Sequence, residues 1–263
     1  MPSFRPLATL ALALCRQDLK ARFAGALLGS LWVLIWPLVQ LFIYIVVFGK
    51  FMGARLTAIQ DQAIYSYGLY VAAGLLAWTC FANTLQRTSR IFVDKRQIIG
   101  KVPVDLRVFP LSICLQELLP LGAGYLLLII ACCILGWQPS ASLVCFSLLA
   151  LAAQQILAMG LGLFFAVLCA FIRDTQEAVA VALQMAFWFT PIVYHPSILP
   201  DWVQKALLVN PMTHVCRVLQ QCFVLGGNVS LGGMAYVCLF ALLASALGLW
   251  TLKSKESGVR DVL

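Results

Sequence analysis

A long apolar run without a charged residue, from Leu31 to Phe48, constrains this chain more than any other feature. At a rise of about 1.5 Å per residue, a helix of that length covers most of the ~30 Å hydrocarbon core of a bilayer. Trp32 and Trp36 stand near its start, where amphipathic indole rings favour the headgroup level. Pro37 predicts a kink, which a membrane helix tolerates when neighbouring helices satisfy the freed carbonyl. The run therefore predicts a membrane-spanning helix.

The rest of the chain repeats this pattern and predicts an all-α membrane protein. Hydrophobic residues make up 62% of the 263 residues and charged residues only 11%, too few to cover a soluble domain. We expect six transmembrane helices, an interface helix at 7–24, and re-entrant outer half-helices at 200–226, broken at Asn210-Pro211, between spans five and six. The spans expected within one transmembrane domain, 1–263, are 31–51, 65–85, 108–135, 143–172, 178–194 and 231–252.

The first apolar stretch, Leu7 to Cys15, follows Arg5 and resembles the hydrophobic core of a secretory signal peptide. No small-x-small cleavage site follows it, and the residues from Arg16 to Lys20 are mostly charged or polar. We therefore prefer an uncleaved helix lying along the cytoplasmic interface of the membrane.

The basic residues predict the orientation of the chain. Most of the 18 Lys and Arg residues fall on one side of the expected spans, above all between Arg87 and Arg107. The positive-inside rule makes that side cytoplasmic, so we expect a multi-pass membrane protein with both termini in the cytoplasm. The net charge of +8 is dispersed and not gathered on one face, so no nucleic-acid partner is expected.

Groups that would carry catalysis or bind a cofactor are few. The ten cysteines contain no CxxC pair, and His195 and His214 lack an HExxH-like spacing, so we expect no catalytic residue and no metal site. The Gly-Lys pairs at 49–50 and 100–101 lack the other residues of a phosphate-binding loop. No cofactor is therefore expected in this subunit, and any ATP and magnesium would bind to a separate partner.

Glu117 is the one acid embedded in an apolar helix. A carboxylate buried in lipid is costly, so such a residue is by default a candidate functional group. The alternative is that Glu117 lies at the inner headgroup level beside Gln116, because enough residues follow it before Leu135 to cross the bilayer. The sequence leaves both interpretations open.

Aromatic side chains in the expected spans also have two interpretations. They form either an interface belt with ordinary packing or a path for sugars, whose rings present apolar faces that stack on aromatic rings. The candidates for a substrate path are Phe42, Tyr44, Tyr70, Trp78, Phe81 and Trp188.

Three stretches, in the same order and spacing along essentially the whole chain, resemble one known family. They are 20–25 (KARFAG) with 28–32 (LGSLW) and 37–38 (PL), then Arg173-Asp174 with Gln184 and 189–194 (FTPIVY), and then 210–212 (NPM) with Arg217. These stretches are similar to segments of the permease subunits of type-2 ABC exporters, in the branch that exports O-antigen, capsule or teichoic-acid polymers. Trp36 departs from the asparagine common in that family, and Glu117 falls where the family often has an acid.

The resemblance implies a permease subunit, without its own ATP site, that moves a lipid-linked polysaccharide from the cytoplasmic side across a bacterial inner membrane. It implies a homodimer with two separate ABC ATPase subunits. The residues expected to couple to the ATPase are Arg16, Asp94, Lys95, Arg173, Asp174 and Glu177. The alternatives are a permease of the same fold for drugs or other lipids and, from another class, an integral-membrane enzyme acting on isoprenoid phosphates, which would need clustered acids or histidines.

A polymer carried on an isoprenoid diphosphate would present a strongly anionic group at the inner leaflet. Guanidinium groups hold phosphate oxygens in a bidentate manner. The alternative role of the same cations is topological anchoring. The candidates for contact with the lipid diphosphate are Lys20, Arg22 and Arg90.

Overall fold

The computed structural model describes residues 7–22, 24–51, 66–101, 104–136, 138 and 140–262, with the backbone alone for 48–51. Over these residues the chain is helical and forms no strand, so the expectation of an all-α protein is confirmed. Residues 52–65, which connect the first two expected spans and include the start of the second, lie outside the described residues.

Five helical segments in the described part of the chain are long and apolar enough to cross a membrane. They are Gly29–Val47, α3 (Ser66–Ser89), α6 (Val108–Ile134), α7 (Ala141–Phe171) and α11 (Leu231–Val262). The fifth span expected at 178–194 coincides with α8 (Thr175–Trp188), whose 14 residues extend roughly 21 Å. The chain is therefore a multi-pass membrane protein, and the count of six spans stays a prediction.

Shorter elements complete the fold. They are α1 (Leu7–Arg22), η1 (Gly29–Leu31), α2 (Trp32–Phe42), η2 (Ile43–Phe51), α4 (Ile91–Asp94), α5 (Arg96–Ile99), η3 (Pro196–Ile198), α9 (Asp201–Leu207), α10 (Pro211–Gln220) and η4 (Gln221–Leu225). The predicted break at Asn210-Pro211 is where α10 begins: Pro211 occupies its first turn, and the Asn210 side chain accepts a hydrogen bond from the Met212 N–H at 3.0 Å.

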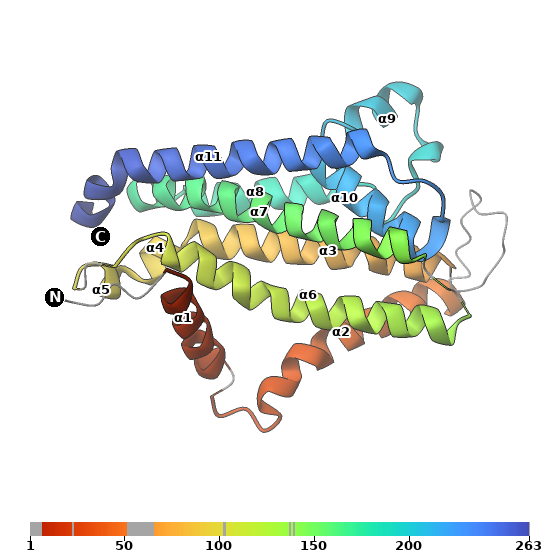
Figure 1. Cartoon of the computed structure of the whole chain (residues 1–263), viewed down its shortest axis with the longest axis horizontal. Helices are drawn as coiled ribbons and strands as arrows, with labels where there is room; N and C mark the ends of the chain where they lie inside the picture. Colours follow the sequence, from red (N-terminus) through yellow and green to blue (C-terminus); the bar gives the residue numbers. More distant parts are fainter. Residues whose placement is uncertain are drawn as a thin grey trace.

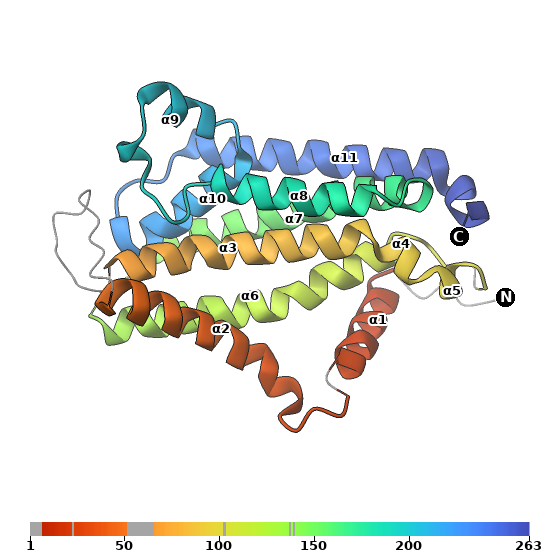
Figure 2. The ribbon, with the colours of Figure 1, turned by 180° about the vertical axis from the view of Figure 1, so that it is seen from behind.

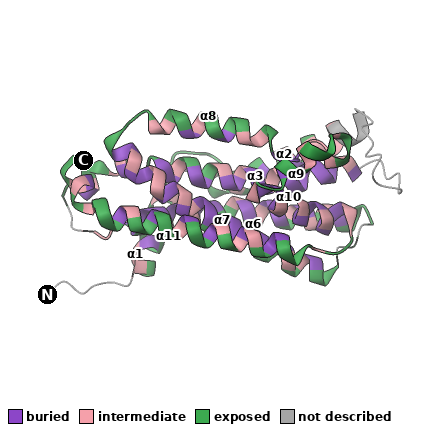
Figure 3. Cartoon of the chain, turned by 90° about the horizontal axis from the view of Figure 1, so that it is seen from above, coloured by how far each residue is buried: buried purple, intermediate pink, exposed green. Residues whose placement is uncertain are grey.

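The long helices run side by side, as Figures 1 and 2 show. One end of the bundle carries α4, α5, the turn between α7 and α8, and the last turns of α11 (Figure 1). We call it the basic end, because Arg87 to Lys101, Arg173 and Lys253 to Arg260 lie there. The opposite end carries α9 and the start of α11. Figure 3 shows buried residues along the middle of the bundle, whereas α8 carries mostly exposed and partly buried residues.

The helices α1 and α2 form an arch beside α6. Both pack on α6, but the end of α1 and the start of α2 lean away from the bundle and meet in the turn around Gly25 (Figures 1 and 2). The turn and the α2 side of this arch are strongly apolar, with Leu27, Trp32 and Trp36 exposed, whereas α1 exposes Arg16 and Lys20. The arch therefore presents a lipid-compatible surface next to the basic end.

The helices α7 and α11 pack with their backbones in close contact. A Cβ atom added at Gly160 would lie 2.5 Å from the backbone nitrogen of Ser245, and one added at Gly248 would lie 2.5 Å from the Gly160 carbonyl oxygen. Small residues allow membrane helices to approach this closely and to gain dispersion energy along their whole contact.

Buried amides join α7 to α3. Gln154 donates from Nε2 to the Ala77 carbonyl at 3.0 Å, and Gln155 accepts from the Thr84 hydroxyl at 3.0 Å. Hydrogen bonds of this kind hold membrane helices together, at roughly 0.6–2 kcal/mol each. The central helix α3 is thus fixed against α7 through polar contacts as well as packing.

The chain after α8 forms a turn, and three side chains of the bundle donate hydrogen bonds to its backbone carbonyl groups. Tyr67 donates to the Val193 carbonyl at 2.7 Å, Tyr70 to that of Tyr194 at 3.1 Å, and Gln220 to that of Pro191 at 3.0 Å. These contacts tie the end of α8 to α3 and α10, away from the basic end.

The helix α11 continues well past the expected end of its span. The tail expected after residue 252 is helical through Val262. Val259 is fully buried in a cluster with Phe92 and Phe109, and Arg260 donates from Nη2 to the Val104 carbonyl at 2.7 Å. The carboxyl-terminal turns are therefore packed against the segment around α4 and α5.

Candidate functional site

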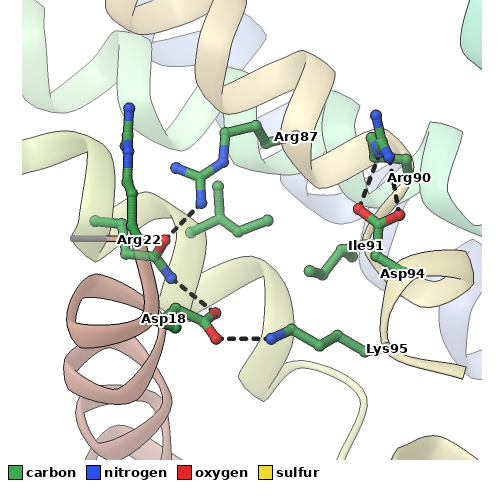
Figure 4. Close-up of a pocket in the computed structure, with 10 residues that line it drawn as sticks. Asp18, Arg22, Arg87, Arg90, Ile91, Asp94 and Lys95 are labelled. Atoms are coloured by element: carbon green, nitrogen blue, oxygen red, sulfur yellow. Dashed lines mark hydrogen bonds and ion pairs between the residues drawn. The ribbon is translucent and has the colours of Figure 1, made fainter. Parts of the chain in front are cut away.

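A cavity of about 520 Å³ opens at the basic end between α1, α3, α4 and α6. We call it the basic cavity, and Figure 4 shows its side chains. Its lining residues are Asp18, Ala21, Arg22, Arg87, Arg90, Ile91, Asp94, Lys95, Ile113 and Gln116. Four cations and two acids face one another there, so the lining carries a net positive charge.

Arg87 and Glu117 form an ion pair between α3 and α6. Nη1 of Arg87 bonds Oε1 of Glu117, and Nη2 donates to Oε1 of Gln116 at 2.5 Å. The Glu117 side chain is only 3% exposed, so its carboxylate depends on Arg87 for compensation of its charge. The Glu117 side chain therefore lies inside the protein, toward the basic end, and does not face lipid.

A second ion pair joins α1 to the segment between α4 and α5. Nζ of Lys95 lies 2.7 Å from Oδ1 of Asp18, and both side chains are 22% exposed. Gln116 donates from Nε2 to the other Asp18 oxygen at 3.2 Å, so one amide connects this pair to Arg87 (Figure 4). Four elements thus meet through one continuous polar network.

The third ion pair is local. Arg90 donates from Nε to Asp94 at 2.9 Å and from Nη2 at 3.1 Å, four residues along the chain. These hydrogen bonds and the Asp94 charge raise the pKa of the Arg90 guanidinium further above its ordinary value. Arg90 therefore remains charged at the mouth of the basic cavity.

A second cavity, of about 410 Å³, lies beneath the arch, and we call it the arch cavity. It shares Arg22 and Gln116 with the basic cavity. Its remaining lining residues are Leu19, Ala26, Trp32, Val33, Trp36, Asn83, Glu117 and Pro120. A smaller cavity of about 170 Å³ continues it along α2 and shares Trp36, Asn83, Glu117 and Pro120. A cavity lined by six charged side chains and a cavity lined by both apolar and polar side chains thus lie next to each other at the foot of the arch.

The structure brings together two of the three residues expected to contact a lipid diphosphate. Arg22 and Arg90 line the basic cavity, whereas Lys20 is exposed on α1 and is not among the lining residues. Arg87, which also lines the cavity, is not among the residues expected at such a site. In the sequence it is only a basic residue at the end of an apolar helix, which equally fits topological anchoring.

The residues expected to couple to an ATPase divide into two groups. Arg173, Asp174 and Glu177 are exposed at and just after the turn between α7 and α8, and Arg16 is exposed on α1. Asp94 and Lys95 instead line the basic cavity. The second group therefore belongs both to the expected contact segment and to the cavity.

The structure brings together three of the six aromatic residues expected along a substrate path, Trp78, Phe81 and Trp188. The ring centroid of Trp78 lies 5.9 Å from that of Phe81 and 5.8 Å from that of Phe187, and the Phe187 centroid lies 5.3 Å from that of the exposed Trp188. These rings connect α3 to the surface of α8.

The other three aromatic candidates lie elsewhere. Phe42 is exposed on α2, and Tyr44 is partly buried in η2. Tyr70 is 1% exposed, and its hydroxyl holds the turn after α8, so in this conformation it offers no face for stacking.

The basic and arch cavities have the chemistry of a binding site. Guanidinium and ammonium groups hold oxyanions through charge-assisted hydrogen bonds, and the neighbouring indole and valine side chains accept an apolar chain. Among the described residues, no three His, Cys, Asp or Glu side chains form a group that could hold a metal ion.

Comparison with known proteins gives a consistent result. The O-antigen export system permease protein RfbA of Klebsiella pneumoniae is 27% identical over 217 residues, covering 82% of this chain and 81% of its own. The protein of the same name from Myxococcus xanthus is 26% identical over 216 residues, covering 81% and 80%. The polysialic acid transport protein KpsM of Escherichia coli is 23% identical over 248 residues, covering 94% and 93%. The family model described as ABC-2 type transporter matches residues 9–224, and the chain therefore belongs to the ABC-2 type transporter family.

Proposed function

We propose that this chain is the permease subunit of an ATP-driven exporter that moves a lipid-linked polysaccharide out of the cytoplasm. The observation that carries the proposal is the basic cavity lying directly beside the arch cavity, with Arg22 and Gln116 shared between them. The names of the relatives, which export O-antigen or transport polysialic acid, support the polysaccharide.

The basic cavity and the exposed apolar surface of the arch match the two parts of a polyprenyl diphosphate. The diphosphate is an oxyanion that Arg22, Arg87 and Arg90 can chelate with their forked donors. The polyprenyl chain is apolar and fits the exposed surface of the arch at Trp32 and Trp36, which leads from the arch cavity to lipid. A carrier could thus place its headgroup among the cations without drawing its tail into water.

The proposed topology has the basic end in the cytoplasm of a bacterial inner membrane, with both termini inside. The excess of Lys and Arg at that end supports it. In this topology α8 and the turn after it form a sixth crossing, and α9 and α10 are re-entrant half-helices at the outer side. The hydrogen bonds that fix residues 191–194 to α3 and α10 support this topology, because they satisfy non-helical backbone within the protein.

The proposed assembly is a homodimer with two ABC ATPase subunits that bind the ATP and magnesium. The exposed turn at Arg173-Asp174 and the segment of α4 and α5 are the proposed ATPase contacts, because both are charged and lie at the basic end. The exposed aromatic surface at Trp188, continuous with Phe187 and Trp78, is the proposed side of the polymer path.

Arginine-to-lysine changes test the proposed headgroup site. A lysine keeps the charge but loses the bidentate fork, so Arg22→Lys and Arg90→Lys together should lower export about tenfold at unchanged membrane abundance, given ~1.5–3 kcal/mol for a hydrogen bond to a charged group. The measurement is surface polysaccharide in cells that lack the chromosomal copy, complemented with each variant.

The matched control is Arg107→Lys. Arg107 is held by Asp105 at 2.7 Å, much as Arg90 is held by Asp94, but it is not among the residues lining the basic cavity. The control should export normally. Normal export by the double variant would reduce Arg22 and Arg90 to topological anchors, and unaltered surface polysaccharide in cells without any copy of the chain would refute the proposed function.

A further inference from the structure

We infer that the ion pair between Asp18 and Lys95 couples occupancy of the basic cavity to ATP hydrolysis by the partner subunit. We call this ion pair the lock. The anionic headgroup of the carrier takes Lys95 from Asp18, and the separation of α1 from the segment between α4 and α5 then permits stimulated ATP hydrolysis. This inference rests on the proposed function and adds a sensing step to the same site.

The pair is positioned for such a role because it joins two elements that otherwise belong to different parts of the fold. Asp18 lies on α1, and Lys95 is the single residue between α4 and α5. The two residues are 77 positions apart, and their charged atoms lie 2.7 Å from each other at the wall of the cavity (Figure 4). A ligand in the cavity can therefore contact the lock directly.

The exchange is favourable because a diphosphate is a stronger partner than one carboxylate. It carries more negative charge and offers more acceptor oxygens, and charge-assisted hydrogen bonds to phosphate are among the strongest in proteins. Both residues of the lock are partly exposed, so neither charge is left in a dry interior when the ion pair opens. The ligand thus binds the open state better than the closed one, which is what a population shift requires.

The hydrogen-bond network also connects Arg87 to the lock. Gln116 accepts from Arg87 through Oε1 and donates to Asp18 through Nε2. An anion that draws Arg87 toward the cavity removes the donor that orients this amide. The contact of Gln116 with Asp18 then weakens together with that of Lys95.

The test measures ATP hydrolysis by the purified permease and ATPase complex in lipid vesicles. A long-chain polyprenyl diphosphate is the probe, and polyprenol of the same length and inorganic diphosphate are the comparisons. Wild-type hydrolysis should rise about fivefold or more with the probe, within the usual range of coupling between sites, and should not rise with polyprenol. Stimulation by inorganic diphosphate alone would indicate that the headgroup without the lipid opens the lock.

Three variants identify the lock. Asp18→Asn and Lys95→Gln should each raise hydrolysis in the absence of probe to near the stimulated rate, leaving less than about twofold stimulation. The charge swap Asp18→Lys with Lys95→Asp restores an ion pair and should restore dependence on the probe. A merely structural role would not predict this recovery of regulation, and copurification of the ATPase shows that each complex is assembled.

The matched control is Glu256→Gln. It also breaks an ion pair at the basic end, but the partner Arg260 lies four residues away on α11 and neither residue lines the basic cavity, so the contact between α1 and Lys95 is kept. The stimulation of this variant by the probe should remain like that of the wild type. The inference is overturned if Asp18→Asn stays as dependent on the probe as the wild type while the probe still stimulates, and that result leaves the proposed function intact. A wild-type complex that neither binds nor responds to the probe overturns both.

Discussion

Replacing Gly160 by leucine is expected to reduce the folded chain in the membrane at least tenfold. A Cβ atom added at this position would lie 2.5 Å from the Ser245 nitrogen and 2.7 Å from the Ala244 carbonyl carbon. Both are backbone atoms, which cannot rotate away. Overpacking of a core typically costs about 1–3 kcal/mol, and here it would force α7 and α11 apart along their full length. Membrane abundance and thermal stability in detergent measure the effect.

The matched control is Gly122→Leu. Gly122 lies in α6, also within a candidate span, and a Cβ there meets nothing within 4 Å. The control should accumulate like the wild type, since its new side chain reaches only the exposed face of α6. Equal abundance of Gly160→Leu and Gly122→Leu would show that α7 and α11 are not packed as closely as described.

The second large effect is expected at the ion pair of α3 and α6. Arg87→Leu leaves the carboxylate of Glu117 buried without its partner, and breaking a buried pair in this way costs about 3–5 kcal/mol. Because Arg87 itself is 35% exposed, we expect the lower end of that range. The apparent melting temperature of the purified variant should fall clearly, and export should be lost with it.

The double variant Arg87→Leu with Glu117→Leu separates pairing from packing. Replacing both members of a buried pair by apolar residues is often neutral or stabilising, so the double variant should recover most of the melting temperature but not export. Arg107→Leu, which breaks the exposed pair with Asp105, should change stability little. A double variant no more stable than Arg87→Leu would contradict the assignment of the pair.

Local sequence rules predicted the helices and several of their ends. The start of α10 follows from Asn210 as cap and Pro211 in the first turn, both short-range preferences. Hydropathy located α3, α6 and α7 because an apolar run must be buried in lipid or protein. It could not locate the end of α11, because hydropathy reports where the membrane ends and the helix continues through Val262 on contacts with other segments.

The candidate site was only partly predictable, because its pairs are formed by tertiary structure. Arg22 and Arg90 could be selected as basic residues at the inner ends of helices. The partners of Glu117 and Lys95 could not, since Arg87 lies 30 residues from Glu117 and Asp18 lies 77 residues from Lys95. The buried position of Tyr70 likewise depends on the turn after α8, which sequence spacing alone does not place.

The most direct test of the central claim is the binding of a polyprenyl diphosphate to the purified chain. Its affinity should exceed that of the corresponding polyprenol by about tenfold or more, because charge-assisted hydrogen bonds form only with the diphosphate. Replacing Arg22 and Arg90 by glutamine should remove this preference while the affinity for polyprenol remains. Equal affinities of the wild type for both lipids, or an unchanged preference in the double variant, would contradict the assignment of the basic cavity as the headgroup site.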